Sequence, residues 1–371
     1  MKNLKTLSLY TTSGEIAGTT YYRIYQYLDN ERFRIRKCPR LTNEMYRKWM
    51  PISHKNIIFK ILVFILLYLR TFYFLLRDCI CPPDTIVVSR SILTKILPPS
   101  FKIMIKYLKR RGVDFIWDFD DDIIATGEMR ETDFNWFCEI PSHIVVASDN
   151  NLRLLPAEVQ QKCIKLPTTD RDMYQGFSES LVQDRLKSLN IERRIVWVGS
   201  AVSLPFLIRI MPAFEEYAAT HTQHGIKVRL TVVCNKPLKY SPVSFDLENV
   251  KWTREKAIES MRNAHIGIMP LPNTRITQGK GGFKLIQYLS IGLPIIGSPI
   301  GINNQLITSD VGVKADIENM SAWVTGLNKI LAGEEAYIQF SKNAFAHWMK
   351  EYSYPYNLDI WLKLIEGNHN N

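Results

Sequence analysis

Short apolar runs alternate along the chain with longer segments in which apolar residues recur every three to four positions. This pattern predicts parallel β-strands joined by covering helices, because a strand buried on both faces is apolar throughout and a covering helix is apolar on one side. Repeated units of this kind build doubly wound α/β domains. The predicted strands are Leu4–Tyr10, Thr85–Ser89, Phe115–Phe119, His143–Ser148, Ile195–Val198, Arg229–Cys234, Ile266–Pro270 and Pro294–Gly297. Helical patterns between them include Leu93–Arg111, Pro205–His221 and Phe283–Ile291.

The alternation pauses once, near the middle of the chain. Lys165–Asp170 reads KLPTTD and leads into a polar stretch before the strand predicted at Ile195. Two domains of ordinary size are therefore expected, at residues 1–168 and 169–345, followed by an aromatic-rich helical tail at 346–371. Ligands of open α/β sheets bind beyond the carboxyl ends of the strands, so a cleft between two facing domains is the expected site.

Positive charge is concentrated in the first third of the chain. The net charge is +11, and residues 1–113 hold 21 Lys and Arg against 6 Asp and Glu, whereas the remainder holds 26 against 30. This asymmetry indicates that one domain meets an anionic surface, either nucleic acid or an anionic membrane leaflet. No stacking motif or nucleic-acid-binding module supports the first, so nucleic acid is not an expected partner.

The segment Ile57–Leu76 is apolar except for Lys60 and Arg70. A charge as central as Arg70 disfavours a membrane-spanning helix. Two interpretations stay open: a buried crossover helix, or a helix partly sunk in the membrane interface with its basic residues toward lipid headgroups. The predicted membrane-associating region is 32–77. Its upstream cations and interfacial aromatic residues are Arg32, Arg34, Arg36, Lys37, Arg40, Tyr46, Arg47, Lys48, Trp49 and Lys55.

The cysteines and the start of the chain indicate the cellular compartment of the protein. Six cysteines are scattered without zinc spacing or a disulfide framework, which is typical of a reducing compartment. The first predicted strand begins almost at Met1, leaving no room for a secretion signal. The expected location is cytoplasmic, peripheral on the inner face of the cell membrane.

A glycine-rich loop follows the strand predicted to end at Pro270. Gly279, Gly281 and Gly282 let backbone approach a ligand closely, and the helix predicted from Phe283 offers unpaired N–H groups and a positive dipole end. Lys280 and Lys284 add cations there, and a cation in the first helical turn is favourable only if an anion offsets it. A plain glycine-rich turn is the simpler alternative, since glycine motifs alone are weak. The lysines favour a diphosphate site.

The same segment resembles the donor-binding motif of GT-B-fold retaining glycosyltransferases of the family 4-like, surface-polysaccharide type. The matching residues are Gly279-Lys280, Phe283-Lys284-Leu285, Tyr288, Gly292-Leu293-Pro294-Ile295-Ile296 and Ser298-Pro299-Ile300-Gly301. His265–Leu271 is similar to the segment that precedes this motif, and Val198-Gly199-Ser200 resembles the glycine turn after the first strand of the donor domain. The resemblance implies a GT-B fold of two Rossmann-like domains whose last helix returns to the N-terminal domain.

The resemblance also implies roles for these residues. Lys280 and Lys284 would act catalytically on the departing diphosphate. Donor-binding positions would be Gly199, Ser200, Gly279, Gly281, Gly282, Phe283 and Gln287. The family pattern has two glutamates with seven residues between them, but here Gly279 and Gln287 stand at those positions. Gln287 can still hydrogen-bond vicinal hydroxyls, since an amide both donates and accepts.

Two segments of the N-terminal half resemble the same family more loosely. The loop and helix start in Tyr10–Leu28 are predicted to place Gly14, Gly18 and Thr19 near the donor phosphates. Arg23 would contact phosphate or acceptor, or form a surface salt bridge. After the predicted strand at His143, Asn150 and Asn151 are expected on the acceptor side.

Four carboxylates lie at the end of the strand Phe115–Phe119. Asp118 and Asp120 are expected on one face of the strand, and Asp121 or Asp122 could instead cap the next helix. Like charges this close are held by a cation, used as caps or used for acid–base work. The family resemblance favours Asp118 or Asp120 as the group that orients or deprotonates the acceptor hydroxyl. It also implies that no metal or other cofactor is needed.

The predicted function is transfer of a hexose, with retention, from a UDP- or GDP-sugar to a glycan hydroxyl in surface polysaccharide synthesis (capsule, exopolysaccharide or O-antigen). The acceptor implied is linked to polyprenyl diphosphate, and an anionic membrane surface is the other expected partner. Two alternatives stay open. One is a nucleotide-sugar-binding partner subunit without transferase activity, favoured by the missing glutamates. The other is a phosphatase that uses Asp118 and Asp120.

Overall fold

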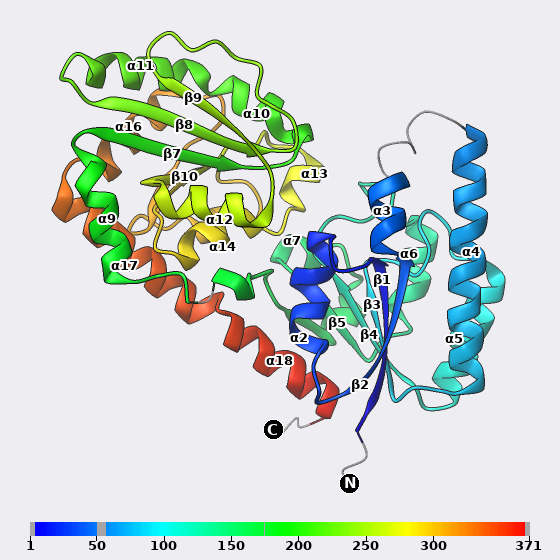
Figure 1. Cartoon of the computed structure of the whole chain (residues 1–371). Coiled ribbons are helices and arrows are strands. Elements are labelled where there is room, and N and C mark those ends of the chain that lie inside the picture. The colour runs from blue at the N-terminus through cyan, green and yellow to red at the C-terminus, as the bar shows by residue number, and fades with distance from the viewer. Residues whose placement is uncertain (1–3, 50–56, 174, 368–371) are drawn as a thin grey trace. The chain divides into compact units, whose positions relative to one another are not determined.

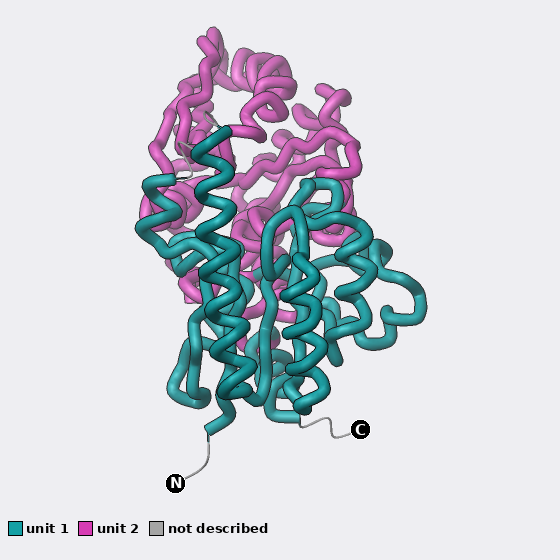
Figure 2. Tube along the Cα trace, turned by 90° about the vertical axis from the view of Figure 1, so that its right-hand side faces the viewer, with its two compact units in different colours: residues 1–168, 279–281, 357–371 teal, residues 169–278, 282–356 magenta. Residues whose placement is uncertain are grey.

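The computed structural model describes residues 4–49, 57–173 and 175–367. Its chain divides into two compact units, coloured separately in Figure 2. Unit 1 comprises Met1–Thr168, Gly279–Gly281 and Asn357–Asn371, and unit 2 comprises Thr169–Gln278 and Gly282–Tyr356. The predicted membrane-region residue Lys55 lies outside the described residues.

Unit 1 is built on a six-stranded, wholly parallel sheet in the order β2-β1-β3-β4-β5-β6 (Figure 1). Its central strands are apolar and buried, as a parallel sheet covered on both faces requires. The strands are β1 Thr6–Ser13, β2 Arg34–Leu41, β3 Thr85–Ser89, β4 Asp114–Phe119, β5 His143–Val146 and β6 Cys163–Lys165.

The helices of unit 1 connect these parallel strands. A continuous helical segment follows β1: α1 Gly18–Thr20, the π-helical stretch Tyr21–Tyr25 and α2 Gln26–Leu28. The others are α3 Asn43–Trp49, α4 Ile57–Ile80, α5 Pro99–Arg110, α6 Glu131–Cys138, α7 Asp149–Leu152 and α8 Ala157–Gln160. A core rich in aromatic side chains, including Trp117, Phe119 and Phe134, lies between the sheet and the α4–α6 side.

Unit 2 has a second six-stranded parallel sheet, in the order β12-β11-β10-β7-β8-β9. This is the strand order of the dinucleotide-binding doubly wound fold. Its strands are β7 Glu192–Val198, β8 Lys227–Cys234, β9 Asp246–Lys251, β10 Ile266–Met269, β11 Ile295–Gly297 and β12 Gly312–Lys314. Two buried apolar clusters flank the sheet.

The helices of unit 2 are mostly short, and the last helix runs on into unit 1. They are α9 Glu179–Leu189, α10 Leu204–Arg209, α11 Met211–Thr222, α12 Arg254–Asn263, α13 Arg275–Gln278, α14 Phe283–Ser290, α15 Asn303–Leu306, α16 Met320–Ile330, α17 Glu334–Glu351 and α18 Tyr354–Glu366. Two 3₁₀ turns lie at Arg171–Met173 and Ala201–Ser203. In α18, Asn357 donates to Pro167 O at 2.7 Å and so ties this helix to unit 1.

All eight predicted strands are present, with ends that differ by a few residues. The four strands that the apolar pattern did not predict are β2, β6, β9 and β12, and these are the four edge strands of the two sheets. An edge strand is open to solvent on one side, so its sequence need not be a continuous apolar run. The basic strand β2 and the largely exposed strand β9 illustrate this.

The topology marks one ligand-binding position in each unit. In unit 1 the strand order reverses between β1 and β3, and in unit 2 it reverses between β7 and β10. Crevices beyond the carboxyl ends of such strand pairs are where open α/β sheets bind ligands. The loop that begins at Gly14 follows β1, and the segments at Gly199 and Gly279 follow β7 and β10.

Candidate active site

The carboxyl end of β7 is fixed by the buried Tyr288 of α14. Its hydroxyl accepts a hydrogen bond from the backbone N–H of Val198 at 3.0 Å. A Cβ on Gly267 of β10 would come within 2.3 Å of the Tyr288 ring, so the ring fills the space that a side chain at Gly267 would need. Gly199 and Ser200 follow Val198 directly, so the predicted glycine turn is held in register with the start of α14.

The start of α14 has the features of an anion site. Gly282 is its N-cap residue, with φ of 65°, a left-handed conformation that favours glycine. A Cβ on Gly282 would also come within 2.6 Å of Leu306 and 2.7 Å of Ile302. No side chain caps the helix and no acidic residue lies in its first turn. The backbone N–H groups and the dipole of this helix end therefore present positive charge.

The lysines predicted for the site lie in this same stretch. Lys280 lies in the loop and Lys284 in the first turn of α14, and both are half-buried, as is Phe283. Two cations at a helix end that already carries positive dipole charge favour a bound anion of more than one negative charge.

The loop Gly279–Gly281 packs within unit 1 against the predicted acceptor-side residues. Asn151, buried in α7, donates from Nδ2 to the Gly279 carbonyl at 3.2 Å. A Cβ on Gly281 would lie 3.3 Å from the Asp120 carbonyl oxygen, and one on Gly279 would lie 2.9 Å from Cβ of Asp122. The structure thus brings together predicted residues that are far apart in sequence. Asn150 is not part of these contacts; its Oδ1 accepts from Arg153 at 3.2 Å.

Gln287 has a partner that the sequence did not predict. Its Nε2 donates to Oδ2 of buried Asp170 at 2.7 Å, in unit 2. Burial, as the main cause, raises the pKa of Asp170 to about 6, and the hydrogen bond from Gln287 opposes this. A carboxylate therefore does stand beside the Gln287 position, supplied by the segment after β6 rather than by α14.

Asp118 is buried at the end of β4 and is paired with Arg23. The guanidinium Nε lies 3.1 Å from Asp118 Oδ1, and Arg23 also donates to the Leu166 carbonyl and to Thr168 Oγ1. Burial raises the pKa of Asp118 while Arg23 opposes that rise. The predicted salt bridge of Arg23 is present, but it is buried inside unit 1 and not on the surface. The contact of Arg23 with phosphate or acceptor stays a prediction. The carboxylate of Asp118 is therefore held in this buried ion pair.

Asp120 is held by Arg90, a residue that the sequence analysis missed. Arg90 NH1 lies 2.9 Å from Asp120 Oδ1 and 2.9 Å from Asp121 Oδ2, and its Nε donates to Glu128 at 2.7 Å. Arg90 has φ of 65°, an uncommon conformation for a residue other than glycine. Its carbonyl accepts from Trp117 Nε1 at 2.8 Å, which helps to hold that conformation. Strained backbone of this kind is concentrated at functional sites.

The remaining carboxylates of the cluster differ in role. Burial and the neighbouring Asp121 raise the pKa of Asp120 to about 6, with Arg90 and Arg23 opposing. Cβ of Asp120 lies 3.8 Å from the position that a Cβ on Gly281 would take. Asp122 Oδ1 accepts from the backbone N–H groups of Ile124 and Ala125, at 3.1 and 2.8 Å, so it caps the following turn. Of the two carboxylates predicted for acid–base or orienting chemistry, Asp118 is held by Arg23, and Asp120 remains the candidate.

The predicted N-terminal loop lies at the reversal point of unit 1. Gly14 begins the loop after β1, and its neighbour Asn43 occupies the space a Cβ would need, 2.2 Å away. Gly18 and Thr19 open the helix in which the π-helical stretch places Arg23 toward Asp118. Such π-helical turns are frequent at functional sites.

Among the described residues, no group of three or more His, Cys, Asp or Glu side chains is placed to hold a metal ion. The carboxylates at the end of β4 are instead neutralised by arginines.

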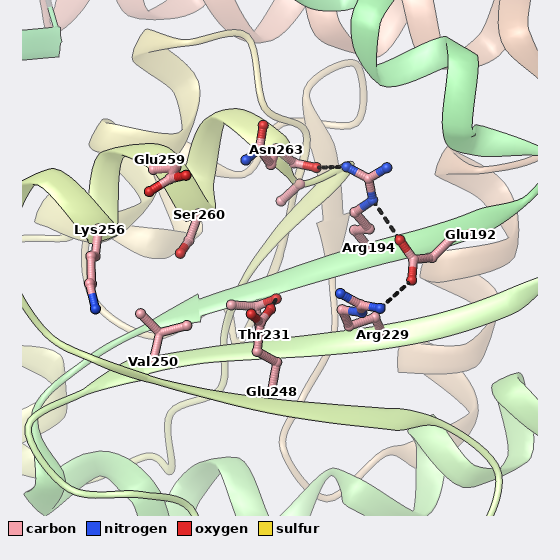
Figure 3. Close-up of a pocket in the computed structure, with 11 residues that line it drawn as sticks. Glu192, Arg194, Arg229, Thr231, Glu248, Val250, Lys256, Glu259, Ser260 and Asn263 are labelled. Atoms are coloured by element: carbon pink, nitrogen blue, oxygen red, sulfur yellow. Dashed lines mark hydrogen bonds and ion pairs between the residues drawn. The ribbon is translucent and has the colours of Figure 1, made fainter.

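A separate hollow of about 510 Å³ lies in unit 2 between α12 and the β7–β9 face of the sheet (Figure 3). Three of its charged side chains pair: Glu192 accepts from Arg194 at 2.8 Å and lies 2.9 Å from Arg229. None of the predicted site residues lines it, so we assign no ligand to it.

Neither a protein-family model nor a curated protein matches the sequence. Solved structures do match along the whole chain. HepE of Anabaena, in complex with UDP and glucose, is 9% identical with a TM-score of 0.62, over 98% of this chain and 99% of HepE. Sucrose-phosphate synthase of Thermosynechococcus elongatus is 11% identical with a TM-score of 0.63, over 98% of each chain. A glycosyltransferase of Rickettsia africae is 11% identical with a TM-score of 0.61, over 100% of each chain.

These similarities agree with the two parallel sheets described above. Each unit is a doubly wound α/β domain, and glycine-rich turns and helix starts lie at the carboxyl ends of the strands where the strand order reverses. At 9–11% identity the likeness concerns the fold. The chain has the GT-B fold of nucleotide-sugar glycosyltransferases.

Proposed function

We propose that the protein transfers a sugar from a nucleoside-diphosphate sugar to a hydroxyl group of an acceptor. The observation that carries this proposal is the start of α14, where Gly282, Lys280 and Lys284 create a positively charged helix end without a capping side chain or acidic residue. A nucleoside diphosphate is an anion of the kind that such a helix end binds. HepE, which has the same fold, was solved with UDP-glucose, so UDP-glucose is the first donor to test.

The donor would bind with its diphosphate at this helix end. Gly199 and Ser200, held in place through the Val198–Tyr288 hydrogen bond, follow the neighbouring strand and approach the same end of the sheet. Gln287 donates to Asp170, which leaves its carbonyl oxygen as an acceptor for a donor hydroxyl, while Asp170 can accept another hydrogen bond. The Asp170–Gln287 pair thus takes the place of the glutamate expected from the family resemblance.

The reaction breaks the bond between the anomeric carbon and the diphosphate oxygen and forms a bond from that carbon to the acceptor oxygen. Lys280, Lys284 and the N–H groups at the start of α14 stabilise the charge that develops on the diphosphate. In the retaining course, the acceptor attacks from the side that the diphosphate leaves, and the leaving phosphate oxygen takes the acceptor proton. Asp120 accepts a hydrogen bond from the acceptor hydroxyl and orients it.

The biological setting proposed is surface polysaccharide synthesis, with a hexose as the transferred sugar and a glycan on polyprenyl diphosphate as acceptor. This follows from the family resemblance at Gly279–Gly301 and from the basic N-terminal region. No metal is assigned a role, since Asp118 and Asp120 at the end of β4 are paired with the arginines Arg23 and Arg90 and not with a metal ion.

The alternative is a nucleotide-sugar-binding subunit without transferase activity. It is favoured by Gly279, which stands where the family pattern has the first of its glutamates and offers no carboxylate to the sugar. A phosphatase using Asp118 as nucleophile is disfavoured, because that carboxylate is buried and bound by Arg23.

The test has two parts measured on the same preparation. A thermal-shift panel of UDP, GDP, ADP and their sugars identifies the nucleotide, and labelled sugar release or transfer is then followed with the donor that binds. Nucleotide binding with turnover supports the transferase. Tight binding without transfer to any lipid-linked or free glycan acceptor supports the binding subunit, and the absence of any nucleotide-dependent stabilisation overturns both.

A further inference from the structure

The first half of α4 exposes apolar side chains on nearly all sides. Ile57, Leu62 and Leu69 are 69%, 60% and 55% exposed, and only Lys60 interrupts the apolar run before Arg70. Figures 1 and 2 show α4 beside α5, with the start of α4 extending past the start of α5. An exposed apolar area of this extent marks a membrane or protein interaction surface.

The second half of α4 is fixed to the sheet of unit 1. Phe74, Leu75 and Asp78 are buried, Asp78 accepts from the Tyr10 hydroxyl at 2.9 Å, and Arg70 donates to the Pro39 carbonyl at 2.9 Å. The helix is long and apolar enough to cross a membrane by length and composition alone. The exposed part, residues 57–69, would be only about 20 Å long at the usual rise. That is shorter than the apolar thickness of a bilayer, about 30 Å, so this part can insert but cannot span.

The helices around the apolar part of α4 are basic, with Arg77 paired to Asp78 and Lys102 to Asp133. The helices α3, α4 and α5 together contain nine Lys and Arg residues: Arg47, Lys48, Lys60, Arg70, Arg77, Lys102, Lys106, Lys109 and Arg110. Their two acidic residues are Glu44, which pairs with Lys48, and Asp78, which is buried. On α5, Ile103 and Tyr107 are exposed beside exposed Lys106 and Arg110, so one helix face combines apolar and basic side chains. This is the composition of an interfacial helix on anionic lipid.

Aromatic residues occur where the apolar and basic parts meet. Trp49 at the end of α3 contacts Phe59 of α4, edge to face, with ring centres 6.2 Å apart. Tryptophan and tyrosine favour the level of the lipid headgroups, where one end of the ring stays near water. This contact joins basic α3 to the apolar start of α4.

We propose that this surface, called here the α4 face and formed by residues 57–69 of α4 with the exposed sides of α3 and α5, docks the protein on an anionic lipid membrane. The apolar residues enter the headgroup–acyl boundary and the cations lie among the lipid phosphates. A second copy of the chain is a poorer occupant, because it would bring another excess of cations to the same surface. The inference does not depend on the chain transferring a sugar.

The experiment is flotation of the full chain with vesicles of phosphatidylcholine alone or of phosphatidylcholine with phosphatidylglycerol. The protein is expected to float with the anionic vesicles, to be released by high salt, and to float little with the neutral ones. The double variant Leu62→Glu/Ile65→Glu, at two exposed positions, is expected to lose binding by roughly tenfold or more. The variant Lys106→Glu/Arg110→Glu is expected to weaken anionic binding by a similar factor.

Matched controls carry the same chemical changes away from the α4 face. Val243→Glu replaces a residue that is 92% exposed in unit 2, and Lys251→Glu reverses an exposed cation there. Both are expected to bind anionic vesicles as the original chain does. The proposal is overturned if the original chain does not float, or if the α4-face variants bind as tightly as the controls. Concentration-dependent dimerisation that Leu62→Glu/Ile65→Glu abolishes, without vesicle binding, would instead assign the face to a second copy.

Discussion

Two charged regions of the chain are organised in opposite ways. At the end of β4 the charges are side chains, and they are paired before any ligand arrives: Arg23 with Asp118, and Arg90 with Asp120 and Asp121. At the start of α14 the positive charge comes from backbone N–H groups and from Lys280 and Lys284, and the helix end has neither an acidic residue nor a capping side chain. The paired charges at the end of β4 hold structure in place, whereas the positive start of α14 has the charge that an anionic ligand prefers.

The comparison predicts that the two regions respond differently to loss of a cation. Removing Arg23 should mainly lower stability, because it leaves Asp118 buried without its partner. Removing a lysine at the start of α14 should mainly lower activity, because Lys280 and Lys284 are only half-buried and lie at the predicted diphosphate position. The predictions below follow in decreasing order of effect.

Arg23→Ala is expected to lower the free energy of unfolding by about 3–5 kcal/mol, the usual cost of leaving one member of a buried ion pair. Chemical denaturation followed by circular dichroism measures this. The control is Arg254→Ala, which breaks the half-exposed pair with Asp172 and should cost about 1 kcal/mol or less. Equal effects of the two substitutions would show that the Arg23–Asp118 pair is not a structural element.

Lys284→Ala and Lys280→Ala are each expected to lower kcat/KM for transfer by roughly 30- to 1,000-fold, or about 2–4 kcal/mol of transition-state stabilisation. The melting temperature should change little. Lys251→Ala, at an exposed position of unit 2, is the matched control. Wild-type rates in both site variants would refute the assignment of the diphosphate to α14.

Gln287→Leu tests the pair that replaces the expected glutamate. The buried Asp170 carboxylate would lose its donor, so we expect a cost of about 1–3 kcal/mol in stability, nucleotide affinity or both. Calorimetry with the nucleotide and with the corresponding nucleotide-sugar measures the change in affinity separately from the change in stability. An unchanged affinity for both ligands would place Asp170 and Gln287 outside the donor site.

The pH dependence of transfer tests Asp120, whose pKa is raised to about 6. Ionised Asp120 accepts a hydrogen bond more strongly, so kcat/KM should fall several-fold as the pH drops through about 6. In Asp120→Asn this acid limb should be absent. The free energy of unfolding has the opposite pH dependence. An acid whose pKa rises on folding binds its proton more tightly when folded, so the contribution of Asp120 to stability falls as the pH rises from about 4 to about 6. A pH profile that Asp120→Asn leaves unchanged would remove Asp120 from the reaction.

The sequence predicted the parts of the fold that are buried and local. Strands in the interior of each sheet have apolar runs because both faces are covered, and all eight were predicted, whereas the edge strands β2, β6, β9 and β12 were not. The helix at Phe283 and the glycine turn before it were predicted at the correct positions. The left-handed conformation of Gly282 favours glycine, and a glycine can be seen in the local sequence.

The partners of the site residues could not be predicted, because they come from distant segments. Arg23 and Asp118 are 95 residues apart, and Asp170 and Gln287 are 117 apart. The local sequence shows that Arg23 is a cation, but it does not show that the carboxylate of Asp118 is buried beside it. The one available signal for Asp170 was an acidic residue at the end of the Pro/Thr segment Lys165–Asp170. Arg90 carried no signal, because its strained conformation depends on tertiary contacts.

The most direct test of the central claim compares a nucleoside diphosphate with its nucleoside in binding to the original chain and to Lys280→Ala/Lys284→Ala. Calorimetry with UDP and uridine, or with GDP and guanosine if the thermal-shift panel selects GDP, measures the share of affinity that the diphosphate contributes. We predict that the original chain binds the diphosphate far more tightly than the nucleoside, that the double variant loses most of this difference, and that Lys251→Ala retains it. Equal binding of diphosphate and nucleoside by the original chain, or an undiminished difference in the double variant, would contradict a diphosphate site at the start of α14.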